Sequence, residues 1–367
     1  MFIPSAKSKV SLLLLLLISL ALFLWVDNSR MFVKEKNYSE KLEAATIMQQ
    51  ASQMIKEYRL DQGIYLDEVN DPNRTALIGE KQTIITTDRG SLTAKLTSLN
   101  PNIAAVVVDL FIKVGLKQGD EVAVSWTGSF PAMNIAVMSA AKALDLELIP
   151  ITSVGASMFG ATDPDFTWLD METFFHEQGF FKYKSVGASI GGGGDLGRGL
   201  NITGRELIQE AIERNNVPLV IDSSLERNIN NKMKIYEESS QDKIKLYVNV
   251  GGGLSSLGNS INGRLVSPGL HKHLNFKNIP LKGTLFLFAE QRVPVLHFLD
   301  IDKLANNYDL PIAPNPIPEP GTGTMFRDER YNLTVTVIAL ILLLMAVMVV
   351  ILFDHSQLKF REGEFNT

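Results

Sequence analysis

The stretch GDEVAVSWTGSFPAMNIAVMSAAKALDLELIPI, residues 119–151, decides the fold class of the chain. Glu121 to Trp126 and Leu146 to Ile151 are short, mainly apolar runs with the length and composition of buried strands. The segment between them, 131–144, has a proline in its first turn and is apolar almost all round, which predicts a helix packed against a sheet. A strand, a helix and a second strand in this order form the unit of a parallel sheet.

The same alternation continues toward the C-terminus. Helices are expected at 163–179, 203–212 and 225–236, and strands at 217–221 and 243–250. Before the quoted stretch, apolar residues from Ile103 to Val114 fall on one helical face, although Val106 to Val108 would by themselves favour a strand. The sequence therefore predicts an α/β fold with a mostly parallel, doubly wound sheet and glycine-rich loops after its strands.

Both ends of the chain are apolar. Val10 to Val26 and Leu333 to Phe353 contain no charged residue, and about 20 helical residues are enough to cross a bilayer. Lys7 and Lys9 precede the first run as they would in a cleaved signal peptide. The residues after that run lack the small-x-small pattern of a cleavage site, which favours an uncleaved anchor. Two transmembrane helices are expected to flank the α/β domain.

The flanking charges predict the orientation. Lys7, Lys9, Lys359 and Arg361 indicate that both termini are cytoplasmic, while basic residues at 30–36 weaken that bias. The domain is therefore expected outside the cytoplasm. The expected organisation is a cytoplasmic N-terminus at 1–9, a transmembrane helix at 10–26, a juxtamembrane amphipathic helix at 27–60 that packs on the domain or on a partner, an extracytoplasmic α/β domain at 61–310, a proline-rich stalk at 311–332, a transmembrane helix at 333–353 and a cytoplasmic tail at 354–367.

Composition excludes several classes of function. The chain has no cysteine, which excludes disulfides and thiolate metal sites, and a formal net charge of -5, which gives no long-range attraction for nucleic acid. Gly192, Gly194 and Gly197 match the dinucleotide-binding pattern by count, but the next helix begins too late for that motif. His271 and His273 have no carboxylate pair at metal-ligand spacing. No cofactor and no metal are expected.

Small-residue loops follow five predicted strands, at 126–131, 152–162, 191–199, 222–226 and 250–260. The carboxyl ends of parallel strands line one crevice, and glycine N–H groups can bind anionic oxygens there. Arg198 and Arg205 could hold a carboxylate, Asp195 an amine, and Ser129 is a helix cap or a nucleophile. The glycines are equally explained as tight turns. The candidate ligand-binding residues are Gly191, Gly192, Gly193, Gly194, Asp195, Arg198, Gly251, Gly252, Gly253, Ser255 and Ser129.

Several of these segments occur together in a known family. DPNRTALIGE (71–80), TTDRGSLTAKLTSLNPN (86–102), GDEVAVSWTGSFPAMNIAV (119–137), GASIGGGGDLGRGL (187–200) and VNVGGGLSSLG (248–258) lie between two anchors. The chain thereby resembles the bacterial poly-gamma-glutamate system protein family. The resemblance implies a membrane-anchored accessory of poly-gamma-glutamate capsule or exopolymer synthesis or export. The synthase membrane components and the anionic polymer would be its partners. It supplies no catalytic residues.

Two other functions stay open. The first is an extracytoplasmic hydrolase or transferase that acts on a gamma-glutamyl or other envelope substrate. Ser129, Asp195, Arg198, Ser255 and Ser256 are its candidate residues. The second is a scaffold without a ligand, in which the glycine loops are only turns.

Overall fold

The computed structural model describes residues 8–274 and 278–364, with side chains as far as Leu352. The chain divides into two compact units, which are described separately. One is the α/β domain, residues 36–326, and the other combines residues 1–35 with 327–367. Lys7 lies outside the described residues, as do the side chains of Lys359 and Arg361, so these parts of the orientation argument stay predictions.

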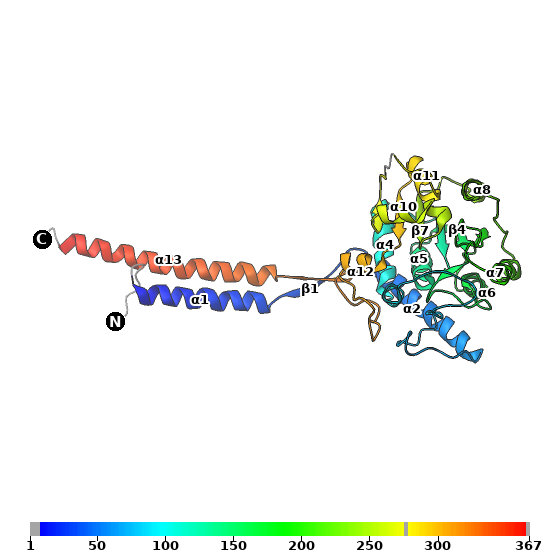
Figure 1. Cartoon of the computed structure of the whole chain (residues 1–367). Coiled ribbons are helices and arrows are strands. Elements are labelled where there is room, and N and C mark those ends of the chain that lie inside the picture. The colour runs from blue at the N-terminus through cyan, green and yellow to red at the C-terminus, as the bar shows by residue number, and fades with distance from the viewer. Residues whose placement is uncertain (1–7, 275–277, 365–367) are drawn as a thin grey trace. The chain divides into compact units, whose positions relative to one another are not determined.

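A six-stranded sheet forms the centre of the domain (Figure 1). Its strand order is β6-β4-β3-β7-β9-β8, and all neighbours pair in parallel except β8 with β9. The expected α/β fold with a mostly parallel sheet is thus confirmed. The strands are β3 (Glu121–Thr127), β4 (Glu147–Ser153), β6 (Gly187–Ser189), β7 (Leu246–Val250), β8 (Gly269–His271) and β9 (Val295–Phe298).

Strand β3 shows why this sequence forms a central strand. All seven of its residues are buried, and it pairs with β4 on one side and β7 on the other. Val122, Val124 and Trp126 belong to one apolar cluster, whereas Ala123 belongs to another. Successive side chains of a strand point to opposite faces, so both faces of the sheet are covered. This explains the mainly apolar run in the sequence.

Helices from different parts of the chain supply the two clusters. The first cluster contains residues of α2 (Tyr38–Asp61), α4 (Asn102–Val114) and α5 (Pro131–Ala143). The second contains residues of α8 (Leu225–Ser239) and α11 (Thr284–Glu290). The remaining elements of the domain are β2 (Thr86–Asp88), α3 (Leu92–Ser98), β5 (Ala156–Ser157), α6 (Trp168–Glu177), α7 (Ile202–Arg214), α9 (Leu254–Leu257), α10 (Ser260–Leu265) and α12 (Ile301–Asn307).

Two local predictions meet different outcomes. The segment with Val106 to Val108 is helical, as α4, and ends at Gly115, whose φ of 92° provides the left-handed cap that glycine favours.

The prediction of a strand at 217–221 is wrong. Only an isolated bridge between Ala188 and Leu219 forms there, because the strand it would extend, β6, has just three residues.

Within the segment expected to hold a juxtamembrane amphipathic helix, 27–60, α2 begins at Tyr38, the first residue of the apolar pattern, and packs within the domain. Ala44, Ala45, Met48 and Ile55 on this helix are fully buried in the first cluster, against α4 and α5. The apolar residues at spacings of three and four therefore mark a core-facing stripe.

The proline-rich segment is not an extended stalk over its whole length. Residues 311–326 belong to the domain unit. The Pro314 carbonyl accepts a hydrogen bond from Asn73 Nδ2 at 2.8 Å, and the Ala313 N–H donates to Thr97 Oγ1 at 3.0 Å. At the end of the segment Phe326 is fully buried and makes an edge contact with Tyr38. Prolines suit this path because its backbone pairs with side chains of the domain and not with a strand ladder.

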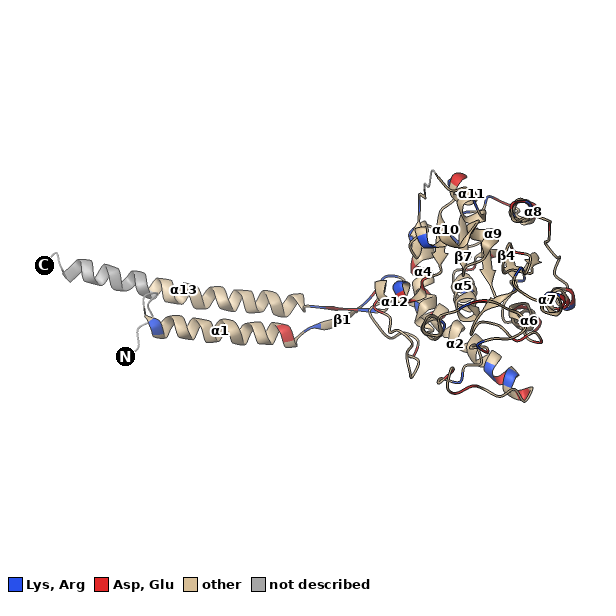
Figure 2. Ribbon diagram, in the orientation of Figure 1, with Lys and Arg blue, Asp and Glu red and all other residues tan. Residues whose placement is uncertain are grey.

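The second unit contains the two apolar helices, α1 (Lys9–Asn28) and α13 (Leu333–Glu364). The spans Lys9–Asn28 and Leu333–Leu352 are long and apolar enough to cross a membrane. Figure 2 shows that the described charged residues of these spans lie at the ends of α1. The bent pair α3 and α4 is apolar as well, but it packs in the core of the domain. Two possible membrane helices agree with the expected membrane association.

A short ribbon adjoins these helices within the same unit. Strand β1 (Met31–Lys34) pairs antiparallel with β10 (Arg327–Arg330), and nearly all their side chains are exposed. Arg30 contacts Asp27 and lies 4.7 Å above the Tyr331 ring. Cross-strand pairing therefore joins the two chain segments between each apolar helix and the domain.

The unit boundary predicts that residues 36–326 fold alone. A fragment of that span keeps the two apolar clusters described above and a third, smaller one that includes Ala188, Ile190 and Ile208, so we expect a monodisperse protein without detergent. Its thermal unfolding, followed by circular dichroism, should be a single cooperative transition. A fragment that stays aggregated, or that unfolds without cooperativity, would show that the domain depends on the apolar helices.

Candidate functional site

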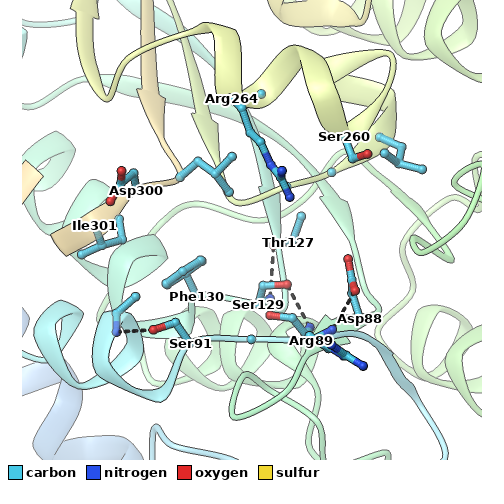
Figure 3. A pocket seen from close by; sticks show the side chains of 18 of the residues that line it. Asp88, Arg89, Ser91, Thr127, Ser129, Phe130, Ser260, Arg264, Asp300 and Ile301 are labelled. Carbon is cyan, nitrogen blue, oxygen red and sulfur yellow. Dashed lines mark hydrogen bonds between the residues drawn. The ribbon is translucent and has the colours of Figure 1, made fainter. Parts of the chain in front are cut away.

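A cavity of about 790 Å³ lies at the carboxyl ends of the parallel strands. The loops that follow β3, β4, β6, β7 and β9 all contribute residues to its lining. Other parts of the lining are residues 87–91 in and after β2, Ala94 and Lys95 on α3, Ser157 on β5, and residues 260–268 in and after α10. Figure 3 shows Arg264 on one side of this cavity and Ser129 with Arg89 on the other. The crevice expected from the alternation of strands and helices is therefore present as a lined cavity.

The structure places the candidate residues in two groups. Those that line the cavity are Ser129, Gly192, Gly193, Arg198, Gly252 and Gly253. Those that do not are Gly191, Gly194, Asp195, Gly251 and Ser255. Arg205 lies in a separate hollow beside α7, next to Glu206, and does not reach the cavity lining.

The glycine run coils tightly against itself. Gly191, Gly192 and Gly194 have φ values between 65° and 82°, where side-chain-bearing residues are strained. The Gly197 N–H donates to the Gly191 carbonyl at 2.7 Å, and the Gly193 and Arg198 backbones bond to each other. A Cβ on Gly193 would lie 2.7 Å from the Arg198 carbonyl oxygen. The glycines are therefore required by the loop geometry, and that geometry presents Gly192, Gly193 and Arg198 to the cavity.

Asp195 has a structural partner in place of a ligand. It is fully buried, and its carboxylate lies 2.8 Å from Lys232 Nζ on α8. The hydroxyls of Ser153 and Ser189 donate to it at 3.0 and 2.8 Å. Lys232 also donates to Ser255 Oγ at 2.6 Å. Asp195 and Ser255, which were expected to contact a ligand, are buried and do not line the cavity, and the amine that Asp195 holds in this structure belongs to Lys232.

This buried pair fixes the loop that carries Arg198. Lys232 is 1% exposed, so each charge depends on the other and on the surrounding hydroxyls. The pair joins the loop after β6 to α8 beneath the cavity wall. Asp195 is itself in the left-handed region, with a φ of 62°, a conformation that its hydrogen bonds hold in place.

Three arginines line the cavity from separate segments. Arg89 follows β2, Arg198 follows β6, and Arg264 lies on α10. All three are exposed, and within residues 8–274 and 278–352 none forms an ion pair. In Figure 3 Arg264 extends toward the loop of Ser129. Arg264 escaped the sequence analysis because nothing local distinguishes it from a solvated surface arginine.

The acidic residues of the lining are engaged elsewhere. Asp88 accepts a hydrogen bond from the Arg89 backbone N–H at 2.7 Å. Asp300 caps α12 by accepting from the Lys303 N–H, and Asp302 accepts from the Thr97 hydroxyl. With Lys303, the lining holds four exposed cationic side chains that have no ion pair among the described residues, against three aspartates, each of which accepts a hydrogen bond from the protein. It therefore suits an anionic ligand.

Lys95 is the least expected residue of the lining. It is 2% exposed, and its Nζ contacts the Ser129 carbonyl and lies 3.0 Å from Ser157 Oγ. The Phe130 ring centroid is 3.8 Å from the same nitrogen. Burial lowers the pKa of Lys95 to about 7. Local sequence gives no signal for this residue, since a lysine on a short helix normally projects into water.

His297 also borders the cavity, but both ring nitrogens are occupied. Its Nε2 lies 3.1 Å from the Gly263 carbonyl, which can only accept, so this nitrogen carries the hydrogen. Its Nδ1 then accepts from Asn249 Nδ2 at 3.0 Å. Burial lowers the pKa of His297 to about 4. The imidazole is thus neutral at physiological pH. Its two hydrogen bonds join β9 to Asn249 on β7 and to Gly263 on α10.

Neither metals nor known relatives identify the site. In the part of the chain that the structure describes, no group of three or more histidine, aspartate or glutamate side chains is placed to hold a metal ion. No protein-family model, no curated protein and no solved structure matches the chain.

Proposed function

We propose that this chain is a membrane-anchored protein that binds poly-gamma-glutamate, or its synthase, through the cavity at the carboxyl edge of the sheet. It would serve as an accessory in the synthesis or export of that polymer. The observation that carries the proposal is the set of three arginines, Arg89, Arg198 and Arg264, which surround glycine loops and form no ion pair among the described residues. The sequence resemblance to the poly-gamma-glutamate system family independently suggests the same ligand.

The strand order supports a binding role at this position. We interpret the domain as doubly wound: the chain runs from β3 outward through β4 to β6, then returns to β7 on the other side of β3 and continues to β9. Ligands of such sheets bind where the winding reverses, at the carboxyl ends of the strands. Ser129 after β3 and Gly252 after β7 both line the cavity at that point.

The chemistry of the polymer matches the arrangement of the arginines. A gamma-linked glutamate chain carries one free carboxylate per residue, and a guanidinium can bind a carboxylate through two parallel hydrogen bonds. Because Arg89, Arg198 and Arg264 line one cavity from different segments, a bound chain would meet more than one guanidinium.

Salt dependence follows from this model. The three guanidinium groups are exposed, so their attraction to a polyanion is screened by ions. Between about 0.05 and 0.5 M NaCl the affinity for poly-gamma-glutamate should fall at least about tenfold. Fluorescence anisotropy of a labelled polymer measures this directly. An affinity that does not change with salt would argue against binding through these arginines.

The proposal includes a location. The two apolar helices would anchor the chain in the cytoplasmic membrane, with the α/β domain extracytoplasmic and close to the synthase membrane components. The basic residues before α1 and after the second span favour this orientation. Protease added to intact spheroplasts should then cleave the domain. Protection of the domain until the membrane is permeabilised would reverse the orientation.

A genetic experiment tests the proposed role. In a strain that makes poly-gamma-glutamate and lacks this chain, surface polymer should disappear and return with the wild-type gene. The variant with Arg89→Ala and Arg264→Ala should reach normal levels in the membrane without restoring polymer. Unchanged surface polymer in the strain that lacks the chain would remove the basis for this function.

A further inference from the structure

We propose that Ser157 and Lys95 form a catalytic pair in the same cavity, with Ser157 Oγ as nucleophile and Lys95 Nζ as general base for acyl transfer. The substrate class is an amide or ester that carries a carboxylate near the bond to be cleaved. This inference rests on the proposed function for the choice of that substrate, but the pair itself stands on separate geometry.

The two side chains meet from different elements at the cavity wall. Lys95 lies on α3 and Ser157 ends β5, and both line the cavity. Their Nζ and Oγ atoms are 3.0 Å apart, within the reach expected of a base and its nucleophile. Ser157 is half-buried whereas Lys95 is 2% exposed, so the serine is the more accessible member of the pair.

The surroundings hold Ser157 in this position. Its backbone N–H donates to Ser129 Oγ at 3.0 Å. On the other side is Gly90, where an added Cβ would lie 3.1 Å from Ser157 Oγ and 2.3 Å from the Met158 carbonyl oxygen. A glycine at position 90 therefore leaves the Ser157 hydroxyl uncrowded. Ser129, the nucleophile considered from the sequence, contributes its carbonyl and hydroxyl as supports for Lys95 and Ser157.

Lys95 has the environment of a base. It forms no ion pair among the described residues and is enclosed by the Phe130 ring. Since burial brings its pKa to about 7, a large share of the amine is neutral at physiological pH. A neutral amine that donates to the Ser129 carbonyl keeps its lone pair for the Ser157 hydroxyl hydrogen.

The reaction balances without another reagent except water. The Ser157 proton moves to Lys95 Nζ as Oγ forms a bond to the acyl carbon, and the same proton passes to the leaving nitrogen or oxygen as its bond to carbon breaks. Water then attacks the acyl ester, and its proton moves through Nζ back to Ser157 Oγ. The products are a carboxylic acid and an amine or alcohol. Helix α5 begins at Pro131, directly after Phe130 in the lining, and adds partial positive charge to this cavity.

A serine-directed fluorophosphonate, applied to the intact chain in detergent, tests the pair. Mass spectrometry should place the label on Ser157. The labelling rate should rise with pH through about 7, because only the neutral amine accepts the hydroxyl proton. Ser157→Ala should remove that label, and Lys95→Met, which keeps the length of the side chain, should slow it at least about 100-fold. Ser52→Ala, which removes a half-buried serine on α2 outside the cavity, is the matched control and should label like wild type.

The outcomes separate this inference from the proposed function. Labelling at another serine, or at Ser157 with no dependence on pH or on Lys95, overturns the pair. If Lys95→Met does not fold, the pH profile of wild type decides by itself. Each protein is also titrated with poly-gamma-glutamate. Polymer binding without labelling rejects the pair and leaves the binding role intact, whereas labelling without polymer binding supports the pair and rejects the polymer as its substrate.

Discussion

Replacement of Asp195 by alanine should lower the free energy of unfolding of the domain by about 3–5 kcal/mol. The change leaves Lys232 Nζ buried without a carboxylate, and the hydroxyls of Ser153 and Ser189 lose their acceptor. A charge without a partner in a low-dielectric interior carries its full desolvation cost. Urea unfolding followed by the fluorescence of the buried Trp126 and Trp168 measures the difference.

Two further variants define the cause. Glu238→Ala removes the partner of Lys234, an exposed pair on the same helix with a distance of 3.4 Å, and should cost less than about 1 kcal/mol. Asp195→Leu combined with Lys232→Met removes both buried charges and should be less destabilising than Asp195→Ala alone. If Asp195→Ala lowers the free energy of unfolding no more than Glu238→Ala does, the pair of Asp195 and Lys232 does not hold the glycine loop in place.

The second large effect concerns ligand binding. Arg89→Ala and Arg264→Ala should each weaken binding of poly-gamma-glutamate about tenfold, and together about 100-fold, because a hydrogen bond to a charged group contributes roughly 1.5–3 kcal/mol. Both side chains are exposed and unpaired in the described part of the chain, so the thermal stability should stay close to that of wild type. Loss of binding together with loss of folding would therefore not fit the model.

Matched substitutions separate charge from geometry. Arg227→Ala removes an exposed arginine on α8 outside the cavity and should leave polymer binding unchanged. Arg264→Lys keeps the charge but not the planar pair of donors, so its affinity should lie between those of wild type and Arg264→Ala. Binding that weakens equally in Arg227→Ala would indicate a general charge effect instead of a site.

The sequence predicted the parts of the fold that depend on local pattern. The run from Glu121 to Trp126 has apolar residues on both faces of the strand, and this pattern alone indicates a central place in a parallel sheet. The strand expected at 217–221 was wrong because an edge position depends on the length of its neighbour β6. The path of residues 311–326 along the domain depends on partners such as Asn73 and Thr97, which no local pattern reveals.

The site was predictable in position but not in composition. The glycine loops after the strands indicated the edge of the sheet at which the cavity lies. The pairing of Asp195 with Lys232, and of Lys95 with Ser157, joins residues that are distant in the chain. The roles of these residues depend on burial. Burial makes the pair of Asp195 and Lys232 hold the glycine loop in place, and it makes Lys95 a candidate base.

The central claim is that the cavity binds a gamma-linked polycarboxylate, and isothermal titration calorimetry of the intact chain in detergent tests it most directly. Poly-gamma-glutamate of defined length is titrated into wild type and into the variant with Arg89→Ala and Arg264→Ala, at low and at high salt. The account predicts saturable binding to wild type that weakens with salt and is nearly lost in the variant. Absence of binding to wild type, or equal binding to both proteins, would contradict it.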